Sequence, residues 1–304
     1  MKIVISGASG LVGKALTENL RADGHTVAHL VRAGGPVAPG DIRWTPTSAN
    51  IDVHALEATD AVVHLSGASV ADGRWTLARK QLIRSSRVDT TRLLVDSLAR
   101  LLHKPRVFVC ASAIGFYGNR GDETLTEASH QGTDFLSFVA RDWEGEAARA
   151  EHSGTRAVML RFGVILSAQG GALPKMMGPF KKGFGGPLGS GEQWMSWITL
   201  EDTIRIIRAA IGDAQPGITP YKGPINVVSP NPVRNSEFTQ ALATVLGRSA
   251  RFRVPAFALR LALGEMANAL LLSSQRVRPE RLLSAGFSFT HENLEPALRA
   301  ILNP

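Results

Sequence analysis

Short apolar runs alternate with longer amphipathic stretches through the first half of the chain. The run from 2 to 6 predicts a buried strand, and the stretch from 11 to 22 repeats apolar residues at helical spacing. Further strands are predicted at 26–31, 60–65, 106–110 and 156–160, with helices at about 76–102 and 135–151. Because parallel strands need crossover connections, this alternation predicts an α/β fold, a Rossmann-type doubly wound parallel sheet with helices on both faces.

The chain changes character at a glycine-rich stretch between residues 170 and 191, which predicts a mobile loop near a lobe boundary. Beyond it, the pattern predicts a helix starting near 201–202, a strand at 225–228 and helices at 236–246 and 294–302. We therefore expect a cofactor-binding Rossmann domain over 1–168, to which about 198–230 returns. A smaller C-terminal α/β lobe over 169–304 is expected to hold the substrate.

A glycine-rich loop joins the first predicted strand to the first predicted helix. Dinucleotide-binding loops need glycine at the tight turn, at the approach to the pyrophosphate and at the helix–strand contact, and the helix N-terminus favours negative charge. The residues expected to hold the cofactor here are Gly7, Ser9, Gly10, Leu11, Val12 and Gly13. The alternative is a purely structural turn, but the position between a strand and a helix favours a dinucleotide site.

The end of the second predicted strand indicates which dinucleotide is bound. NAD-preferring proteins usually carry an acidic residue there for the ribose 2′-hydroxyl. This chain has Val31 and Arg32 instead, with no Asp or Glu between Gly24 and Gly40. A guanidinium can pair with a 2′-phosphate and stack on adenine, so the sequence predicts NADP(H). The alternative is a solvated arginine without a ligand.

Composition narrows the class of protein. The 304 residues carry a formal net charge of +8, but Lys and Arg occur along the whole chain, which favours an anionic small ligand over nucleic acid. The single cysteine, Cys110, lies in an apolar run, as expected of a buried thiol in a reducing compartment.

The N-terminus leaves no room for a secretory leader, and apolar stretches stay short of the ~20 residues of a membrane helix. We expect a cytoplasmic protein without a membrane partner; no Cys/His cluster predicts a metal site.

Several motifs together resemble the extended short-chain dehydrogenase/reductases, in the NAD-dependent epimerase/dehydratase family. They are the glycine loop, Asp60-Ala-Val-Val-His-Leu-Ser-Gly67, Ser112-Ala-Ile-Gly-Phe-Tyr-Gly118 and Trp197-Ile-Thr-Leu-Glu-Asp202. Arg74-Trp75, Trp143-Glu144, Gly264-Glu-Met266 and Ser274-Gln-Arg-Val277 are similar to a subgroup called epimerase family proteins, with a C-terminal domain of unknown function.

The resemblance implies further cofactor contacts. It places Leu65, Ser66 and Gly67 on the adenosine side, Arg87 near the phosphates or ribose, and Gly163, Val164 and Ile165 beside the nicotinamide. Each has a simpler alternative, because Leu65 and Ile165 are compatible with the core and Arg87 with a helix surface.

The catalytic pattern of the resembled family is incomplete. Its enzymes carry a tyrosine four residues before a lysine, whose charge lowers the tyrosine pKa. Here the alignment puts Phe138 and Asp142 at those positions, and phenylalanine carries no proton. Ser112 matches the family serine that orients substrate, and Tyr117 is the remaining candidate proton carrier. Ser112 could instead cap a turn, and Tyr117 could only pack its loop.

Other charged groups are weaker candidates. Glu144 and Glu146 could act as general acids if burial raised the pKa of either, although carboxylates on helices are usually solvated. Lys175, Lys181 and Lys182 could attract an anionic substrate at the glycine-rich stretch, or simply be solvated.

Two functions follow from these observations. The first is an NADP(H)-dependent oxidoreductase or epimerase acting on a small molecule. The second is a non-catalytic NADP(H)-binding protein that regulates a partner or senses redox state, which the missing Tyr/Lys pair favours. The long helices leave a homodimer open, and the substrate is not readable from the sequence.

Overall fold

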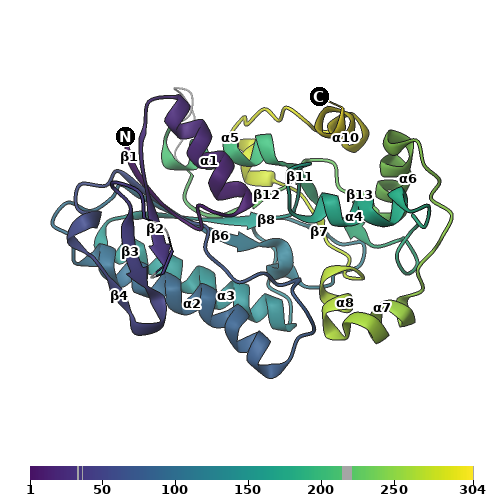
Figure 1. Cartoon of the computed structure of the whole chain (residues 1–304), viewed down its shortest axis with the longest axis horizontal. Helices are drawn as coiled ribbons and strands as arrows, with labels where there is room; N and C mark the ends of the chain where they lie inside the picture. Colours follow the sequence, from purple (N-terminus) through teal and green to yellow (C-terminus); the bar gives the residue numbers. More distant parts are fainter. Residues whose placement is uncertain (33, 36, 214–220, 304) are drawn as a thin grey trace.

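The computed structural model describes residues 1–32, 34–35, 37–213 and 221–303, and an eight-stranded sheet lies at its centre (Figure 1). The strand order is β12-β8-β6-β5-β1-β2-β3-β4, with parallel neighbours except β3 and β4. The strands are β1 (Lys2–Ser6), β2 (Thr26–Arg32), β3 (Ile42–Thr45), β4 (Asn50–Ile51), β5 (Ala61–His64), β6 (Val107–Ala113), β8 (Arg156–Phe162) and β12 (Gly223–Val227). The predicted Rossmann-type sheet is confirmed.

Helices cover both faces of this sheet, as Figure 1 shows. On one face lie α1 (Leu11–Ala22) and α5 (Leu200–Ile211), and on the other α2 (Leu77–Ala99) and α3 (Phe135–Ala148). Local signals fix the helix starts: the Thr76 hydroxyl accepts from the Arg79 amide and the Asp134 carboxylate from the Ser137 amide. Short 3₁₀ turns connect the elements at η1 (Pro46–Ser48), η2 (His54–Leu56), η3 (Ile114–Tyr117) and η4 (Arg149–Ser153).

The later part of the chain adds a second, smaller apolar core. The helices that build this core are α4 (Ala172–Lys181), α6 (Asn235–Leu246) and α10 (Leu294–Leu302). The same part of the chain also forms α7 (Ala256–Leu263) and α8 (Glu265–Leu270). Two-stranded sheets pair β9 (Val164–Leu166) with β11 (Trp197–Thr199), β10 (Trp194–Met195) with β13 (Val233–Arg234), and β7 (Thr124–Leu125) with β14 (Arg276–Val277). Leu173 and Phe180 of α4 pack in this core with Leu242 of α6 and Leu298 of α10.

The helix α4 corrects the prediction of a loop across the whole glycine-rich stretch. Gly178 and Pro179 lie inside this helix and disfavour it locally. Burial of Leu173 and Phe180 overrides that preference, because packing of an apolar face supplies most of the stability of a short helix.

The core of the central sheet also draws on late segments of the chain. Ile198, Ile207 and Val227 pack in it, as do Phe287 and Phe289, which follow α9 (Glu280–Ser284). Residues 214–220, inside the range expected to return to the first domain, lie outside the described residues. Among the helices that the structure describes, none combines the length and the apolar character needed to cross a membrane.

Candidate functional site

The glycine loop is folded so tightly that side chains cannot be added at two positions. Gly7 has φ +72°, and a Cβ there would lie 2.8 Å from the Leu65 carbonyl carbon. A Cβ at Gly13 would lie 2.3 Å from the Gly7 carbonyl oxygen. The helix α1 begins at Leu11, and its N-cap residue, Gly10, has no side chain to cap it; its first turn holds no acidic residue. Its N-terminus is therefore suited to an anionic ligand.

His64 supports this loop from beneath, at the end of β5. Its Nδ1 lies 2.5 Å from the Ser6 hydroxyl oxygen, which also accepts a hydrogen bond from the Leu65 amide. The ring is fully buried beside Trp44 and Phe108. Burial lowers the pKa of His64 to about 3, because a charged imidazolium would lose its hydration there.

The buried His64 predicts a specific pH dependence of stability. Between about pH 6.5 and pH 3 the unfolded chain binds a proton that the folded protein does not. The free energy of unfolding therefore falls as the pH is lowered from about 6.5, by up to about 1.4 kcal/mol per pH unit from this group. Urea unfolding between pH 7 and pH 5 should show a smaller slope in His64→Gln than in the wild type. His130→Gln, at an exposed position, should keep the wild-type slope, and equal slopes in all three proteins would contradict the assignment.

The predicted adenosine side lies next to the loop. Arg32 ends β2, is exposed and has no carboxylate partner among the described residues, while Val31 is half-buried. Leu65 and Ser66 follow β5 and lie against Gly7. The strand order places β1 between β2 and β5, so these residues share the carboxyl edge of the sheet.

Arg87, which the resemblance places near the phosphates or ribose, lies beside Gly67 and Trp143. Its guanidinium is close to Gly67, where an added Cβ would be 3.2 Å from Cζ, and it stands 5.3 Å from the Trp143 ring centre. Burial lowers the pKa of Arg87 to about 10, with a smaller contribution from the nearby Arg79. The structure thus brings Arg87 and Gly67 together, and Arg87 is not a solvated surface residue.

At the predicted nicotinamide side, packing of the protein itself explains why residue 163 is glycine. A Cβ at Gly163 would lie 2.6 Å from the Ser196 carbonyl oxygen, so backbone packing alone requires glycine there. Val164 donates its amide to the same oxygen, and Ile165 packs against the central core. Gly171 lies against Leu11 of the glycine loop, with 3.1 Å between an added Cβ and a Leu11 methyl group.

A buried ion pair stands at the end of β6, beneath the expected catalytic residues. Arg161 of β8 donates from Nε and one terminal nitrogen to the two oxygens of Glu144 on α3, over 2.8 and 2.7 Å. The Ser112 hydroxyl donates to Glu144 over 2.6 Å. Arg161 also donates to the Tyr117 hydroxyl over 2.9 Å, and Tyr117 donates to the Asn226 side chain over 2.7 Å.

This network changes the interpretation of both expected catalytic residues. Ser112 is 3% exposed and Tyr117 is fully buried, so neither hydroxyl faces open space. Burial raises the pKa of Tyr117 to about 12, against the opposing effect of Arg161. The arrangement favours the packing alternative for Tyr117. The expectation that Glu144 is solvated is wrong, because Arg161 neutralises it inside the protein.

The other candidates lie away from this network. Burial alone would raise the pKa of Glu146, but hydrogen bonds from Arg92 and Arg149 outweigh it and hold that pKa below its usual range. Phe138 is exposed, and Asp142 accepts from Arg84 on α2. The expected lysines are solvated on or beside α4: Lys175, Lys181 and Lys182.

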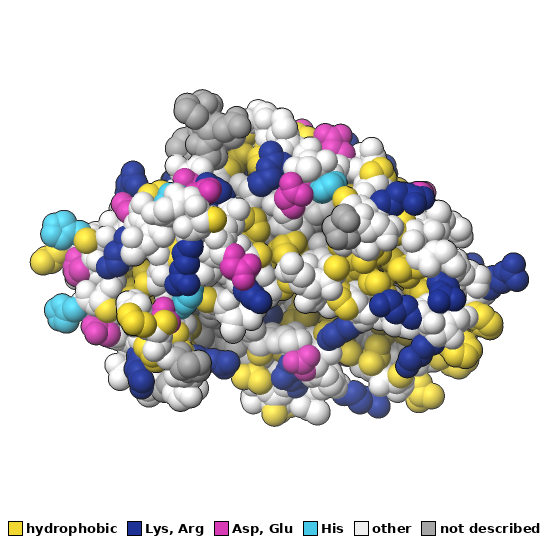
Figure 2. Space-filling model, turned by 45° about the horizontal axis from the view of Figure 1, so that its top comes forward, with side chains coloured by type: hydrophobic (Ala, Val, Ile, Leu, Met, Phe, Trp, Pro, Cys, Tyr) yellow, Lys and Arg dark blue, Asp and Glu magenta, His cyan; other side chains and the backbone are white. Residues whose placement is uncertain are grey.

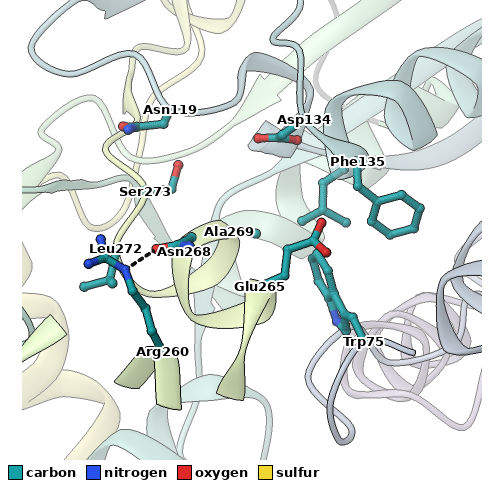
Figure 3. A pocket seen from close by; sticks show the side chains of 11 residues that line it. Trp75, Asn119, Asp134, Phe135, Arg260, Glu265, Asn268, Ala269, Leu272 and Ser273 are labelled. Carbon is teal, nitrogen blue, oxygen red and sulfur yellow. Dashed lines mark hydrogen bonds between the residues drawn. The ribbon is translucent and has the colours of Figure 1, made fainter. Parts of the chain in front are cut away.

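A cavity of about 300 Å³ opens between the start of α3 and the helices α7 and α8 (Figure 3). Its lining is Trp75, Asn119, Asp134, Phe135, Leu136, Arg260, Glu265, Asn268, Ala269, Leu272 and Ser273. Asn119 and Ser273 lie on one side of it, and Phe135 and Trp75 on the other. The Ser273 hydroxyl is buried without a hydrogen-bond partner among the described residues. The sequence did not point to this cavity, since its walls come from segments over 100 residues apart.

Polar contacts join segments of the later part of the chain to α2 and to the residues that follow β6. Glu265 of α8 pairs with Lys80 of α2 over 2.5 Å. Gln275 donates its side-chain amide to the carbonyl oxygens of Ile114 and Gly118, both over 3.1 Å. Among the residues of α3 that line the cavity, Leu136 is nearest in sequence to Phe138, the position that the alignment puts opposite the family tyrosine. Leu136 is apolar, as Phe138 is, and neither side chain carries a proton.

Comparisons with known proteins identify relatives over the whole chain. A model of the NAD dependent epimerase/dehydratase family matches residues 3–222, and a domain of unknown function matches 254–301. An epimerase family protein of Mycobacterium bovis is 43% identical over 97% of this chain and 96% of its own length. The human epimerase family protein SDR39U1 is 33% identical over 99% of this chain and all of its own.

Solved structures agree with the fold. The crystal structure of the human protein with NADPH superposes with a TM-score of 0.86 at 30% identity, covering 100% of this chain and 99% of the other. A nucleoside-diphosphate sugar epimerase of Corynebacterium glutamicum gives 0.81 at 38% identity, and this chain covers 58% of its length. A UDP-glucuronic acid 4-epimerase of Bacillus cereus, at 17% identity and 0.79, is alike in fold alone.

Proposed function

The chain belongs to the NAD dependent epimerase/dehydratase family, and we propose that it binds NADP(H) and uses it as an oxidoreductase or epimerase on a small molecule. The observation that carries the proposal is that three features of a dinucleotide site occur together at the carboxyl edge of the sheet. Gly7 and Gly13 admit no side chain, α1 has an uncapped N-terminus, and Arg32 stands free of carboxylates among the described residues. The human relative was crystallised with NADPH, which supports the choice of NADP(H) over NAD(H).

Arg32→Ala tests the choice of cofactor. Loss of a guanidinium from a phosphate removes a charge-assisted hydrogen bond worth about 1.5–3 kcal/mol, or roughly 10- to 150-fold in Kd. We expect calorimetric titration to show NADPH affinity falling by that factor while NADH affinity stays unchanged. Arg43→Ala, at an exposed position on the neighbouring strand β3, is the matched control. An unchanged preference for NADPH in Arg32→Ala would remove this residue from the site.

The chain's own residues divide the chemical work. NADP(H), when bound, would supply hydride exchange at its nicotinamide. We assign substrate to the cavity between α3 and α8, where Trp75 and Phe135 exclude water and Asn119 and Ser273 offer hydrogen bonds. Ser112 and Tyr117 are assigned as positioning residues, acting through the Glu144–Arg161 pair at the end of β6. We therefore expect the group that transfers the proton to be one of the residues that line the cavity, and not Ser112 or Tyr117.

One observation favours the second candidate, a non-catalytic NADP(H)-binding regulator. Both hydroxyls at the end of β6 are engaged within the protein, and neither Phe138 nor Leu136 carries a proton. The discriminating measurement is NADPH oxidation with a panel of aldehydes and ketones, beside calorimetric binding of NADPH alone. Turnover that Ser273→Ala reduces supports the enzyme, whereas tight NADPH binding without turnover on any compound favours the regulator.

A further inference from the structure

The positive charge of the protein is concentrated in two segments that pack together. Residues 166–191 and 238–264 contain seven Lys and Arg and no Asp or Glu, which leaves 27 Lys and Arg against 26 Asp and Glu in the rest of the chain. Lys and Arg themselves are spread along the whole chain, as expected, but Asp and Glu are absent from these two segments. The backbones of these segments join where the Phe252 amide donates to Gly185 and the Val254 amide to Pro187.

Large apolar side chains are exposed on the same part of the molecule. Phe257 and Leu261 are 71% and 77% exposed, one helical turn apart on α7, a helix in which no residue is buried. Phe184 and Phe252 are exposed as well and pack edge to face, with 5.7 Å between ring centres. We call these four residues the apolar ridge. A soluble surface seldom gathers such side chains without a partner.

Cations frame the apolar ridge. Lys181 and Lys182 precede Phe184, and Arg251 and Arg253 flank Phe252. All four are exposed, and none has a carboxylate partner among the described residues. Figure 2 shows hydrophobic and basic side chains gathered at the right-hand end of the molecule, over this lobe.

We propose that the apolar ridge and its framing cations dock the protein on the surface of an anionic phospholipid bilayer. Aromatic and leucine side chains that enter the headgroup boundary, with lysine and arginine around them, are the features of interfacial binding, and the charge complements acidic headgroups. The phosphates of a nucleic acid would pair with the cations, but they would not bury an exposed apolar side chain such as Leu261. The proposal departs from the expectation of no membrane partner, which rested on the absence of a membrane-spanning stretch, because peripheral contact needs no such stretch.

Vesicle co-sedimentation of the full chain tests the proposal. We expect binding to phosphatidylcholine vesicles containing about one-third phosphatidylglycerol and little binding to pure phosphatidylcholine; about 1 M salt, where the Debye length is about 3 Å, should release the protein. Phe257→Ser with Leu261→Ser should weaken binding by about tenfold or more. Lys181→Glu with Lys182→Glu should also weaken binding to the anionic vesicles, because it replaces two attracted charges by two repelled ones.

Matched controls separate this result from other causes. Leu102→Ser removes an equally exposed leucine, 87% exposed, on the far lobe and should leave vesicle binding unchanged. NADPH titration of each variant should give the wild-type Kd, so the docking surface and the cofactor site succeed or fail independently. The proposal is overturned if the wild type ignores anionic vesicles, or if light scattering shows a dimer that the Phe257/Leu261 double variant converts to a monomer.

Discussion

Glu144→Ala is expected to lower the free energy of unfolding by about 3–5 kcal/mol, the largest effect of any single substitution proposed for this protein. The change leaves the Arg161 guanidinium, 3% exposed, without its carboxylate inside the protein. It also removes the acceptor of the Ser112 hydroxyl. Urea unfolding monitored by tryptophan fluorescence measures the loss, and NADPH titration below the transition shows whether the end of β6 still supports the site.

A surface pair provides the comparison. Glu295 and Arg299 form an ion pair of 2.6 Å on α10, with both side chains about half exposed. Glu295→Ala should cost less than about 1 kcal/mol, because water screens the pair. Replacing both buried partners, as Glu144→Leu with Arg161→Met, should restore much of the stability lost in Glu144→Ala. Equal losses from Glu144→Ala and Glu295→Ala would mean that Arg161 reaches solvent in solution.

Gly13→Ala is expected to weaken NADPH binding by at least about 100-fold, or about 2.7 kcal/mol. A Cβ at this position would lie 2.3 Å from the Gly7 carbonyl oxygen, a backbone atom that cannot move without opening the loop. The backbone amides at the start of α1 would then no longer point together at the site expected for the cofactor phosphates. Calorimetric titration of folded protein, verified by circular dichroism at the same temperature, measures the effect.

Gly145→Ala is the opposite case and the control. This glycine lies inside α3, and a Cβ there would meet nothing within 4 Å. Alanine should raise the free energy of unfolding by about 0.5–1 kcal/mol and leave NADPH binding unchanged. Full NADPH affinity in Gly13→Ala would show that the loop does not bind the cofactor.

The sequence predicted the central sheet because its signals are local. Strands such as Lys2–Ser6 and the helix Leu11–Ala22 carry their periodicity within one segment, and glycine at 24 ends that helix visibly. The helix α4 was missed because its stability comes from distant partners in α6 and α10, whereas its own glycine and proline argue against it.

The direction of side chains at the end of β6 was the harder problem. Sequence placed Ser112 at the correct edge of the sheet, but which face it points to depends on Glu144 and on Arg161, which lies 49 residues further along the chain. A partial signal existed. Glu144 lies four residues after Ala140 and three before Ala147, and both are buried, so a carboxylate on the apolar face of α3 was readable as a buried charge in need of a cation.

The late return of the chain to its first core has a consequence for how the protein is made. Leu282, Phe287 and Phe289 pack against strands formed by the first residues of the chain. Translation proceeds from the N-terminus, at about 5–20 residues per second, so the sheet waits on the ribosome with apolar surface uncovered until nearly the whole polypeptide has emerged. The glycine loop can form early, but the face of the sheet that packs against Leu282, Phe287 and Phe289 is covered only at the end of synthesis. Premature termination would release a nascent chain whose exposed core is a substrate for chaperones and proteases.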